Sequence, residues 1–281
     1  MAGVVEAIMS GGFSPSRNFC AAPGGPRRVM AFFKDRLVVA TRGAAVMIPR
    51  PGDLAAAVLK PGTSLRLGTL RGKACEAWGL SQAPNLSDGL ELAGLRTLYG
   101  RLAEDEFQAA GYAMQLLNWA ADHRFCGRCA SPMVLEMEDR ALSCPDCRYT
   151  IYPRISPAVI VAITSGDRLL LARSGRFPGR RMFSVIAGYV EPGETLEDCV
   201  RREIREEVGL TVRRIRYFGS QAWPFSGSLM VGFTAEHAAG RIAVDGKEIL
   251  EADWFAPDRL PEIPGKISIA RELIDWFVDN H

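Results

Sequence analysis

Hydrophobic and polar positions alternate differently in the two halves of this chain. In the first half, short apolar runs separated by turn residues predict a small, mixed, strand-rich domain over residues 29–98. Turn signals at Asp35 and in the cluster 49–52 predict hairpins. A longer run predicts one helix over residues 104–122. Residues 1–28 are rich in Gly, Pro, Ser and Ala, which predicts a mobile start with a turn.

The second half combines longer apolar strands with two amphipathic helices. One helix is predicted directly after Thr195, and another is predicted over residues 267–278. Strands on both sides of the first helix, and a helix at the end, indicate an α+β domain. These strands are predicted at residues 158–164, 168–173, 182–187, 211–221 and 229–236, and around Trp254 and Phe255.

The helix after Thr195 carries clear end signals. Thr195 is a preferred N-cap residue, Asp198 stands three positions on as in a capping box, and Gly209 is the expected stop. We expect the helix to lie with one apolar stripe on a hydrophobic core. The stripe recurs every four residues and consists of Leu196, Val200, Ile204 and Val208.

Three glutamates stand on the same helix at positions i, i+3 and i+4. Glu203, Glu206 and Glu207 are therefore expected to share a face that points away from the apolar stripe. Like charges this close destabilise a helix unless a cation binds them, and hard divalent cations prefer such oxygen ligands. The alternative is a solvated acidic helix whose glutamates form ion pairs with Arg202 and Arg205.

The composition of the chain indicates the cellular compartment of the protein more clearly than its binding partners. A chain of 281 residues suits two or three small domains, and the net charge of +2 indicates no particular partner. Hydrophobic residues make up 48% of the chain, yet no apolar run is long enough to span a membrane. The start of the chain lacks the basic region of a signal peptide, so we expect a cytoplasmic protein.

Four of the seven cysteines form two CxxC pairs separated by 14 residues. The pairs Cys126–Cys129 and Cys144–Cys147 supply four thiolates, which suit tetrahedral Zn²⁺ and leave the metal no open position. The segment between them predicts a hairpin that turns near residues 138–139, as in a zinc ribbon. A lone CxxC suggests a redox pair, whereas a second pair favours structural zinc in a reducing compartment.

The sequence predicts three domains. They are the strand-rich domain with its following helix at residues 1–122, the ribbon at residues 123–153, and the α+β domain at residues 154–281.

The stretch 188–210 reads GYVEPGETLEDCVRREIREEVGL. It has Gly188, five residues, Glu194, seven residues, and then Arg-Glu-Ile-Arg-Glu-Glu-Val-Gly-Leu over residues 202–210. This spacing resembles the signature of the Nudix hydrolases without a mismatch. The resemblance implies an α/β/α sandwich, the Nudix fold, and an enzyme in which water attacks a nucleoside diphosphate linked to another moiety.

A second stretch, 219–226, reads GSQAWPFS and follows the first. It resembles the aromatic motif of the NADH pyrophosphatase (NudC-like) subfamily, with Ala222 and Ser226 where the family usually has proline. For this stretch alone, an aromatic hairpin turn packed in the core is the alternative. The chain contains, in this order, a strand-rich domain, a four-cysteine ribbon, a Nudix stretch and this motif. The NudC-like subfamily has the same order, so the resemblance extends over essentially the whole chain.

The resemblance also implies how the acidic residues work. Catalytic Mg²⁺ or Mn²⁺ would bind the diphosphate, and Glu206 or Glu207 would orient or deprotonate the attacking water. Arg202 is expected to pair with Glu194 and to brace the preceding loop against the helix. The implied catalytic residues are Glu203, Glu206 and Glu207, and the implied metal ligands are Ala187 through its carbonyl, Glu203, Glu207 and Glu248.

Substrate contacts are implied by position as well. Tyr152 and Tyr189 fall where the subfamily stacks the nicotinamide ring, and ring faces suit the bases of a dinucleotide. Asp139 and Ala270 match two further substrate-contact positions of the subfamily. The alternatives are equally good on the sequence: Asp139 is then an ordinary turn residue, and Ala270 is an alanine that packs in a helix interface. The remaining implied contacts run along the aromatic motif: Gln221, Ala222, Trp223, Pro224, Phe225, Ser226, Gly227 and Ser228.

The implied reaction is metal-dependent hydrolysis of NADH or NAD⁺ to nicotinamide mononucleotide and AMP by a homodimer. RNA with a 5′ NAD cap is a related substrate. Two alternatives remain: a Nudix hydrolase of another nucleoside diphosphate such as ADP-ribose, and a zinc-ribbon binding module with a catalytically dead Nudix domain. Candidates for contacts with RNA phosphates, or else solvated surface, are the arginines at 173, 176, 180, 181, 213, 214 and 216.

Overall fold

The computed structural model describes residues 12–16, 27–54, 57, 59–175 and 181–281. The chain divides into two compact units, Met1–Arg154 and Ile155–His281. Most of the predicted mobile start lies outside the described residues, and so do Arg176 and Arg180. Among the described helices, none is both long enough and apolar enough to cross a membrane.

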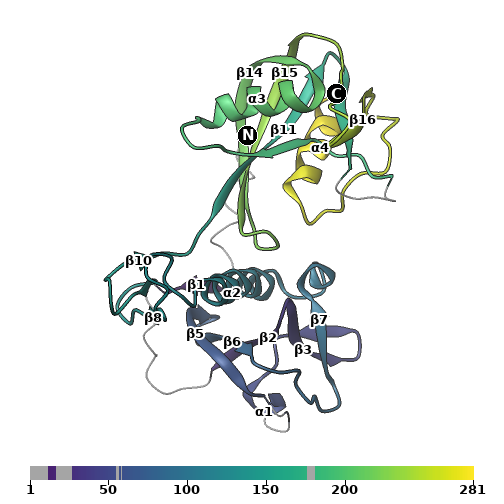
Figure 1. Cartoon of the computed structure of the whole chain (residues 1–281). Coiled ribbons are helices and arrows are strands. Elements are labelled where there is room, and N and C mark those ends of the chain that lie inside the picture. The colour runs from purple at the N-terminus through teal and green to yellow at the C-terminus, as the bar shows by residue number, and fades with distance from the viewer. Residues whose placement is uncertain (1–11, 17–26, 55–56, 58, 176–180) are drawn as a thin grey trace. The chain divides into compact units, whose positions relative to one another are not determined.

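The body of the first unit is one seven-stranded sheet (Figure 1). Its strands are β1 (Phe13–Pro15), β2 (Arg28–Phe33), β3 (Arg36–Arg42), β4 (Ala45–Met47), β5 (Pro61–Leu70), β6 (Lys73–Leu80) and β7 (Leu90–Gly94). They follow the order β1-β5-β6-β2-β3-β4, with β7 beside β3, and β2 runs parallel to β6. The helices of this unit are α1 (Pro51–Leu54), η2 (Leu95–Leu98) and α2 (Glu104–Asp122), of which α2 packs through Leu117 on Gly79 of β6.

Three local predictions for the first unit have different outcomes. The hairpin predicted at Asp35 is confirmed, because Phe33 of β2 pairs with Arg36 of β3. The helix predicted over residues 104–122 is confirmed with those bounds. The hairpin predicted at residues 49–52 is wrong, because this cluster leads into the one-turn helix α1. Pro51 takes the first helical position, where its missing N–H costs no hydrogen bond.

The first unit ends in a small three-stranded sheet with the order β10-β9-β8. Its strands are β8 (Val134–Leu135), β9 (Leu142–Ser143) and β10 (Thr150–Ile151). Val134 and Ser143 pair in antiparallel register, which confirms the hairpin predicted near residues 138–139. The guanidinium of Arg140 lies 5.2 Å from the ring centre of Tyr112, so a cation–π contact joins this sheet to α2.

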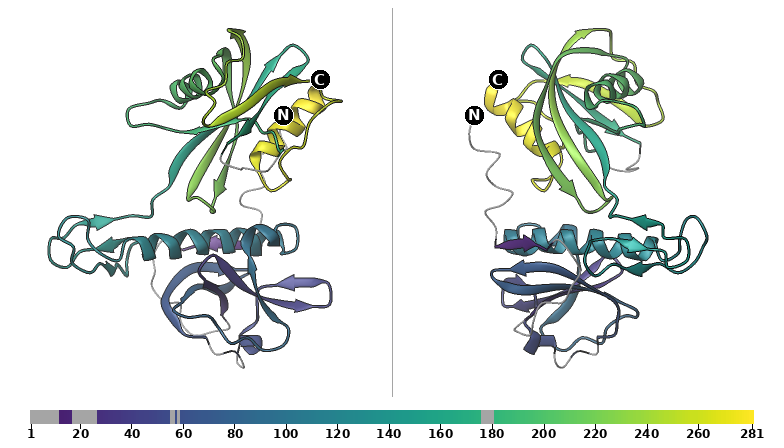
Figure 2. Two further views of the ribbon diagram at one scale, coloured as in Figure 1. Left: turned by 45° about the vertical axis from the view of Figure 1, so that its right-hand side comes forward. Right: turned by 90° about the vertical axis from the view of Figure 1, so that its left-hand side faces the viewer.

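The second unit is a six-stranded sheet with a helix on each face (Figure 2). Its elements are β11 (Ser156–Ser165), β12 (Arg168–Ser174), β13 (Ile186–Tyr189), α3 (Leu196–Val208), β14 (Thr211–Trp223), β15 (Ser228–Ala239), β16 (Ile249–Phe255) and α4 (Ile269–Asn280). The strands follow the order β14-β15-β11-β12-β16, with β13 beside β11. β11 runs parallel to β15, which joins segments far apart in the sequence.

Strand β11 separates two hydrophobic cores, because its side chains alternate between them. Val159, Val161 and Ile163 are buried with the apolar stripe of α3. Ile160 and Ala162 are buried with the inner face of α4. Successive side chains of a strand point to opposite faces, so one strand serves both helices. The expected α/β/α sandwich is confirmed.

One strand begins later than its apolar pattern predicts. The sequence predicts a strand over residues 182–187, but β13 begins at Ile186. Before that point, Ser184 forms an isolated bridge with Ala172 of β12, and the continuous ladder starts where β13 meets β11. Pairing partners decide where a strand begins, and the apolar pattern alone does not contain them.

Candidate functional site

Helix α3 begins and ends at the residues that the sequence predicts. The hydroxyl of Thr195 accepts a hydrogen bond from the amide of Asp198 at 3.2 Å, and Gly209 follows the helix with a left-handed φ of 70°. Val200 and Ile204 of the apolar stripe are fully buried. The stripe fixes the rotation of the helix and therefore the directions of its glutamates.

The three glutamates do not all point away from the core. Glu206 does, with 60% of its side chain exposed, whereas the side chain of Glu203 is 13% exposed. Glu207 is 6% exposed, so the prediction of a shared outward face is wrong for this residue. The reason is helical geometry: Glu207 lies three positions after Ile204 and seven after Val200, so it shares the buried face of the apolar stripe.

The segment before β16 bonds to the last turn of α3 and carries Glu248. The amide of Asp245 donates to the carbonyl of Glu207 at 3.3 Å. The carboxylate of Asp245 accepts hydrogen bonds from the amides of Glu248 at 3.0 Å and Ile249 at 2.9 Å. Asp245 therefore ties Glu248 to the end of α3. It is absent from the predicted site residues, and its available signal is the Asp-Gly pair that it forms with the next residue, a turn motif.

Arg202 gathers acidic groups on one side of α3. Its guanidinium donates to Glu194 at 2.5 and 2.9 Å, to Glu203 at 2.8 Å and to Glu206 at 3.0 Å. It also donates to the carbonyl of Tyr189 at 2.9 Å. The Arg202 guanidinium holds the pKa of the Glu194 carboxyl at about 2, so this ion pair persists at neutral pH. The pair joins the loop before α3 to the helix.

Glu203 rests on the backbone of β13. A Cβ atom at Gly188 would overlap the carboxyl group of Glu203, so the carboxylate lies there because this position is glycine. Burial raises the pKa of the Glu203 carboxyl, the Arg202 guanidinium opposes that rise, and the charges of Glu206 and Glu248 add to it. The effect of Glu248 places its charge near Glu203, although the two residues belong to different segments.

The oxygen atoms at this place suit a hard divalent cation. Glu203, Glu207 and Glu248 offer carboxylates, and Ala187 of β13 offers a backbone carbonyl. In the described part of the chain, however, only the ribbon cysteines bring three or more ligand atoms within 4.8 Å of one another. Arg202 holds Glu203 at 2.8 Å instead. A cation bound here would compete with the guanidinium for that carboxylate.

The aromatic motif spans the tip of the β14–β15 hairpin. Trp223 pairs with Ser228 across the two strands, and residues 224–227 form the turn between them. The rings of Trp223 and Phe225 meet edge to face with their centres 4.8 Å apart. Both residues are half-buried, so the tip presents aromatic surface outward as well as to the fold.

Gln221 fastens this hairpin to α4. Its side-chain amide donates to the carbonyl of Ile267 at 2.9 Å and accepts from the amide of Ile269 at 2.8 Å. Gln221 thus satisfies a backbone amide at the start of α4, where Ser268 makes no side-chain cap. Ala270 is buried in the core that α4 forms. Both residues serve the fold here, and their contact with a substrate stays a prediction.

Tyr189 connects the carboxylate helix to the hairpin. Its phenol oxygen lies 3.2 Å from Oγ of Ser228, which lies 2.8 Å from Oγ of Ser226. Its carbonyl accepts the hydrogen bond from Arg202. The subfamily motif usually has proline at position 226. Because this chain has Ser226 there, its hydroxyl group becomes the third in this row of hydrogen-bonded oxygen atoms. The Tyr189 side chain is exposed, which leaves its ring accessible.

Two other predicted contact residues, Asp139 and Tyr152, meet in the ribbon. The carboxylate of Asp139 accepts a hydrogen bond from the hydroxyl of Tyr152 and raises the pKa of that phenol. Tyr152 is exposed. It belongs to the first unit and Tyr189 to the second, so a stacking clamp formed by the two tyrosines stays a prediction.

The four ribbon cysteines form a cluster that fits zinc. Their Sγ atoms all lie within 4.8 Å of one another, with Cys126 3.5 Å from Cys147 and Cys129 3.4 Å from Cys144. Tetrahedral Zn–S bonds of about 2.3 Å put sulfurs about 3.8 Å apart, close to these distances. Four sulfur ligands leave no open position, so zinc here is structural.

Three family models match this chain in succession. A model described as "NADH pyrophosphatase-like rudimentary NUDIX domain" matches residues 26–119, and one described as "NADH pyrophosphatase zinc ribbon domain" matches residues 121–152. A third, described as "NUDIX domain", matches residues 154–277, which include α3 and its carboxylates. The fold, the site and these matches define a class: enzymes with a Nudix domain preceded by a zinc ribbon.

Two relatives narrow the class. The chain is 50% identical over 191 residues to a protein of Stutzerimonas stutzeri (strain A1501) named NAD-capped RNA hydrolase NudC. It is 48% identical over 191 residues to a protein of the same name from Pseudomonas aeruginosa (strain LESB58). Each match covers 68% of this chain and 68% of the relative. The chain therefore belongs to the Nudix hydrolase family, in the NADH pyrophosphatase group that carries a zinc ribbon.

Proposed function

We propose that this enzyme hydrolyses the diphosphate linkage of NADH and NAD⁺, giving AMP and reduced or oxidised nicotinamide mononucleotide. It also removes NAD caps from RNA, the activity that the names of its two relatives state for those proteins. The position of Tyr189 carries the proposal. Its carbonyl bonds to Arg202 on the carboxylate helix, and its phenol bonds to Ser228 on the aromatic hairpin. One residue thus joins groups suited to a diphosphate with groups suited to a base.

The metal in this proposal is Mg²⁺ or Mn²⁺, held by Glu203, Glu207, Glu248 and the carbonyl of Ala187. Two features support it: the donors are all oxygen atoms, and Gly188 leaves room for a carboxylate against the backbone. When bound, the metal supplies charge neutralisation for the diphosphate and lowers the pKa of a coordinated water.

The chain's own side chains direct the water. Glu206 or Glu207 orients it or takes its proton, and the two offer an exposed and a buried carboxylate for that role. Arg202 keeps the loop that contains Glu194 fixed on α3. Attack breaks one P–O bond of the anhydride, and each product leaves with one phosphate group.

The aromatic hairpin supports recognition of the dinucleotide. Tyr189, Trp223 and Phe225 keep part of their rings exposed, as stacking on a base requires. The further substrate contacts proposed are Asp139 and Tyr152 of the ribbon, together with Gln221, Ala222, Pro224, Ser226, Gly227, Ser228 and Ala270.

Four substrates test the function. Full-length protein with Mg²⁺ or Mn²⁺ is offered NADH, NAD⁺, ADP-ribose and NAD-capped RNA, and the products are separated by chromatography. We expect nicotinamide mononucleotide and AMP from NADH or NAD⁺. Cleavage of ADP-ribose alone would replace the proposed substrate with another nucleoside diphosphate. Cleavage of none would indicate a binding module with an inactive Nudix domain.

Gly188→Ala is expected to lower kcat/KM about 100-fold, because the added methyl group displaces the Glu203 carboxylate by about 1 Å. That carboxylate ends a flexible side chain, so the fold and its melting temperature are retained. Binding of Mn²⁺, followed by its electron paramagnetic resonance, weakens as well. Gly219→Ala is the matched control, since a Cβ there meets nothing within 4 Å. Native activity and Mn²⁺ binding in Gly188→Ala would contradict this role of the glycine.

Tyr189→Phe is expected to raise the KM for NADH about fivefold and to leave kcat unchanged. The variant loses the hydrogen bond to Ser228, a difference of about 1 kcal/mol, and its ring is no longer held for stacking. Tyr217→Phe serves as the control, because Tyr217 donates to Ser220 on the same sheet at 3.3 Å. A native KM in Tyr189→Phe would show that the phenol does not position the ring.

We also propose domains at residues 1–122, 123–153 and 154–281, and a cytoplasmic homodimer. Limited proteolysis tests the boundaries, and light scattering tests the dimer, which has about twice the 30.7 kDa of the chain. Fractionation of cells tests the compartment. A reducing compartment is supported by the cysteines of the described residues, none of which forms a disulfide: Cys75 and Cys199 are buried thiols, and Cys126, Cys129, Cys144 and Cys147 are the proposed zinc ligands.

A further inference from the structure

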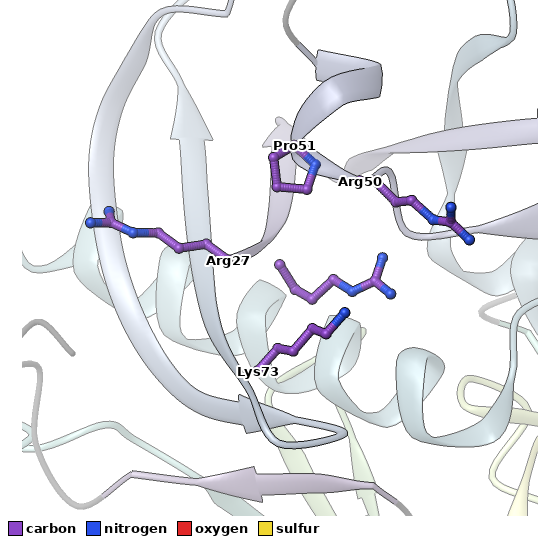
Figure 3. Close-up of a pocket in the computed structure, with 5 residues that line it drawn as sticks. Arg27, Arg50, Pro51 and Lys73 are labelled. Atoms are coloured by element: carbon purple, nitrogen blue, oxygen red, sulfur yellow. The ribbon is translucent and has the colours of Figure 1, made fainter. Parts of the chain in front are cut away.

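A basic pocket lies in the first unit, in the sheet domain that precedes the ribbon. It has a volume of about 340 Å³ and is lined by Arg27, Arg28, Arg50, Pro51 and Lys73. No carboxylate is among these residues. In Figure 3, Lys73 and Arg50 extend toward the same space, whereas Arg27 points to the opposite side.

The sheet topology brings these cations together. Arg28 is the first residue of β2 and Lys73 is the first residue of β6. The two strands are parallel neighbours, with Arg28 in register with Cys75, so both begin at the same edge of the sheet. Arg50 comes from the short segment between β4 and α1 and closes the pocket from that side. Regular structure therefore holds the cluster in place.

Nearby carboxylates already have other partners. Glu76 is bound by the side chain of Arg27 at 3.0 Å, which draws this arginine away from the pocket. Asp53 accepts hydrogen bonds from the side chain of Arg42 and from the backbone amide of Arg50, both at 2.8 Å. The guanidinium of Arg50 therefore forms no ion pair with Asp53.

Among the described residues, the other three cations of the pocket have no acidic partner. Within the ranges that the structure describes, Arg28, Arg50 and Lys73 form no ion pair within 4.0 Å. Like charges that line one pocket repel, and an anion that enters the pocket reduces the repulsion. A second pocket of about 270 Å³ shares Arg28 and Arg50, but it also contains the buried Glu106 and an Arg71 that pairs with Asp105 at 2.6 Å, so the excess of positive charge belongs to the first pocket.

The lining suits the oxygen atoms of a phosphate group. Guanidinium groups bind phosphate oxygens with two parallel N–H bonds, and an ammonium group adds a point charge. No aromatic side chain lines the pocket, so a base finds no ring to stack on. We propose that this pocket binds the phosphate groups of nucleotides, either free or in the backbone of an RNA chain. The RNA source rests on the proposed function, whereas the phosphate chemistry does not.

Direct binding measurements test the proposal. Full-length, zinc-loaded protein without added Mg²⁺ or Mn²⁺ is titrated with pyrophosphate, ADP and a labelled, uncapped ten-nucleotide oligo(A), so that hydrolysis plays no part. In Arg28→Gln/Lys73→Gln, we expect binding to weaken at least tenfold. For the oligonucleotide, the slope of log Kd against log salt concentration falls by about 1.4, at about 0.7 per lost phosphate contact.

A charge-matched control separates the pocket from the general charge of the protein. Lys34→Gln/Arg101→Gln removes two charges elsewhere in the first unit and is expected to bind like the native protein. Lys34 follows the far end of β2, and Arg101 lies 3.9 Å from Glu91. Arg50→Gln changes an exposed side chain and gives a second test if the double variant does not fold.

The outcomes distinguish RNA from free nucleotides as the source of the phosphate, or they reject the phosphate site. Tightest binding of the oligonucleotide assigns the pocket to RNA, and tightest binding of ADP or pyrophosphate assigns it to free nucleotides. Equal binding by the native protein and the pocket variants, or an equal loss in the control, overturns the proposal. Because no substrate is cleaved in these titrations, a failed hydrolysis assay and a failed phosphate site are told apart.

Discussion

Glu207→Gln is expected to hydrolyse NADH about 10³-fold more slowly than the native enzyme. The substitution removes a carboxylate proposed to bind the catalytic metal, and this factor corresponds to about 4 kcal/mol of transition-state stabilisation. Glu207 is buried, and glutamine has nearly the same shape, so the packing around the last turn of α3 is retained. The rate of AMP release at saturating metal and NADH measures the effect.

The control for this variant comes from the same helix. Glu197→Gln removes the same charge from the exposed first turn of α3 and is expected to keep the native rate. Circular dichroism and the melting temperature establish that both variants are folded. Native activity in a folded Glu207→Gln protein would refute the proposed role of this carboxylate.

Removal of zinc is expected to lower the melting temperature by more than about 10 °C before it slows hydrolysis. The ribbon strands β8, β9 and β10 are two residues long each, so this module has little hydrophobic core of its own. Zinc binding contributes about 10–16 kcal/mol to the folding free energy of small zinc modules. In a chain of this size, each kcal/mol of lost stability lowers the melting temperature by about 2–4 °C. Calorimetry of zinc-loaded and zinc-free protein gives the shift.

Hydrolysis is measured in the same samples at 25 °C with Mg²⁺ in excess over the chelator. Cys144→Ser reproduces the loss of stability genetically, and chelation then has no further effect on that variant. Equal melting temperatures of the zinc-free and zinc-bound native protein would reject a structural role for the metal. Earlier loss of activity than of stability would show that the ribbon takes part in the chemistry.

The sequence predicts those parts of the site whose structure depends on residues close to one another in the sequence. The ends of α3 are an example, because Thr195 and Gly209 act on the backbone within one turn. The ribbon is another, since each CxxC pair places two sulfurs through its own spacing. Such features need no knowledge of the rest of the fold.

The burial of Glu207 follows from helical spacing, because Glu207 lies three positions after Ile204 and seven after Val200 on the buried face of α3. What only the fold shows is that the amide of Asp245 bonds to the carbonyl of Glu207. The same segment brings Glu248 close to Glu203, which the resemblance implies and the spacing cannot derive. Long-range contacts of this kind have no local sequence signal beyond the turn residues that permit them.

The wrong hairpin at residues 49–52 has a different cause. Proline and glycine punctuate the chain in many kinds of turn, and they also suit the start of a helix. Here Asp53 bonds back to the amide of Arg50 and closes a single helical turn. The local signal was compatible with both outcomes, and the side chain two residues beyond Pro51 decided between them.

Arg202 has five N–H groups, and it donates to five oxygen atoms. Two belong to Glu194, one each to Glu203 and Glu206, and the fifth is the carbonyl of Tyr189. A lysine would bring the same charge with three N–H groups at a single point, so at least two of these oxygens would lose their donor. The number and directions of the protons at this position, and not its charge, therefore make arginine irreplaceable by lysine.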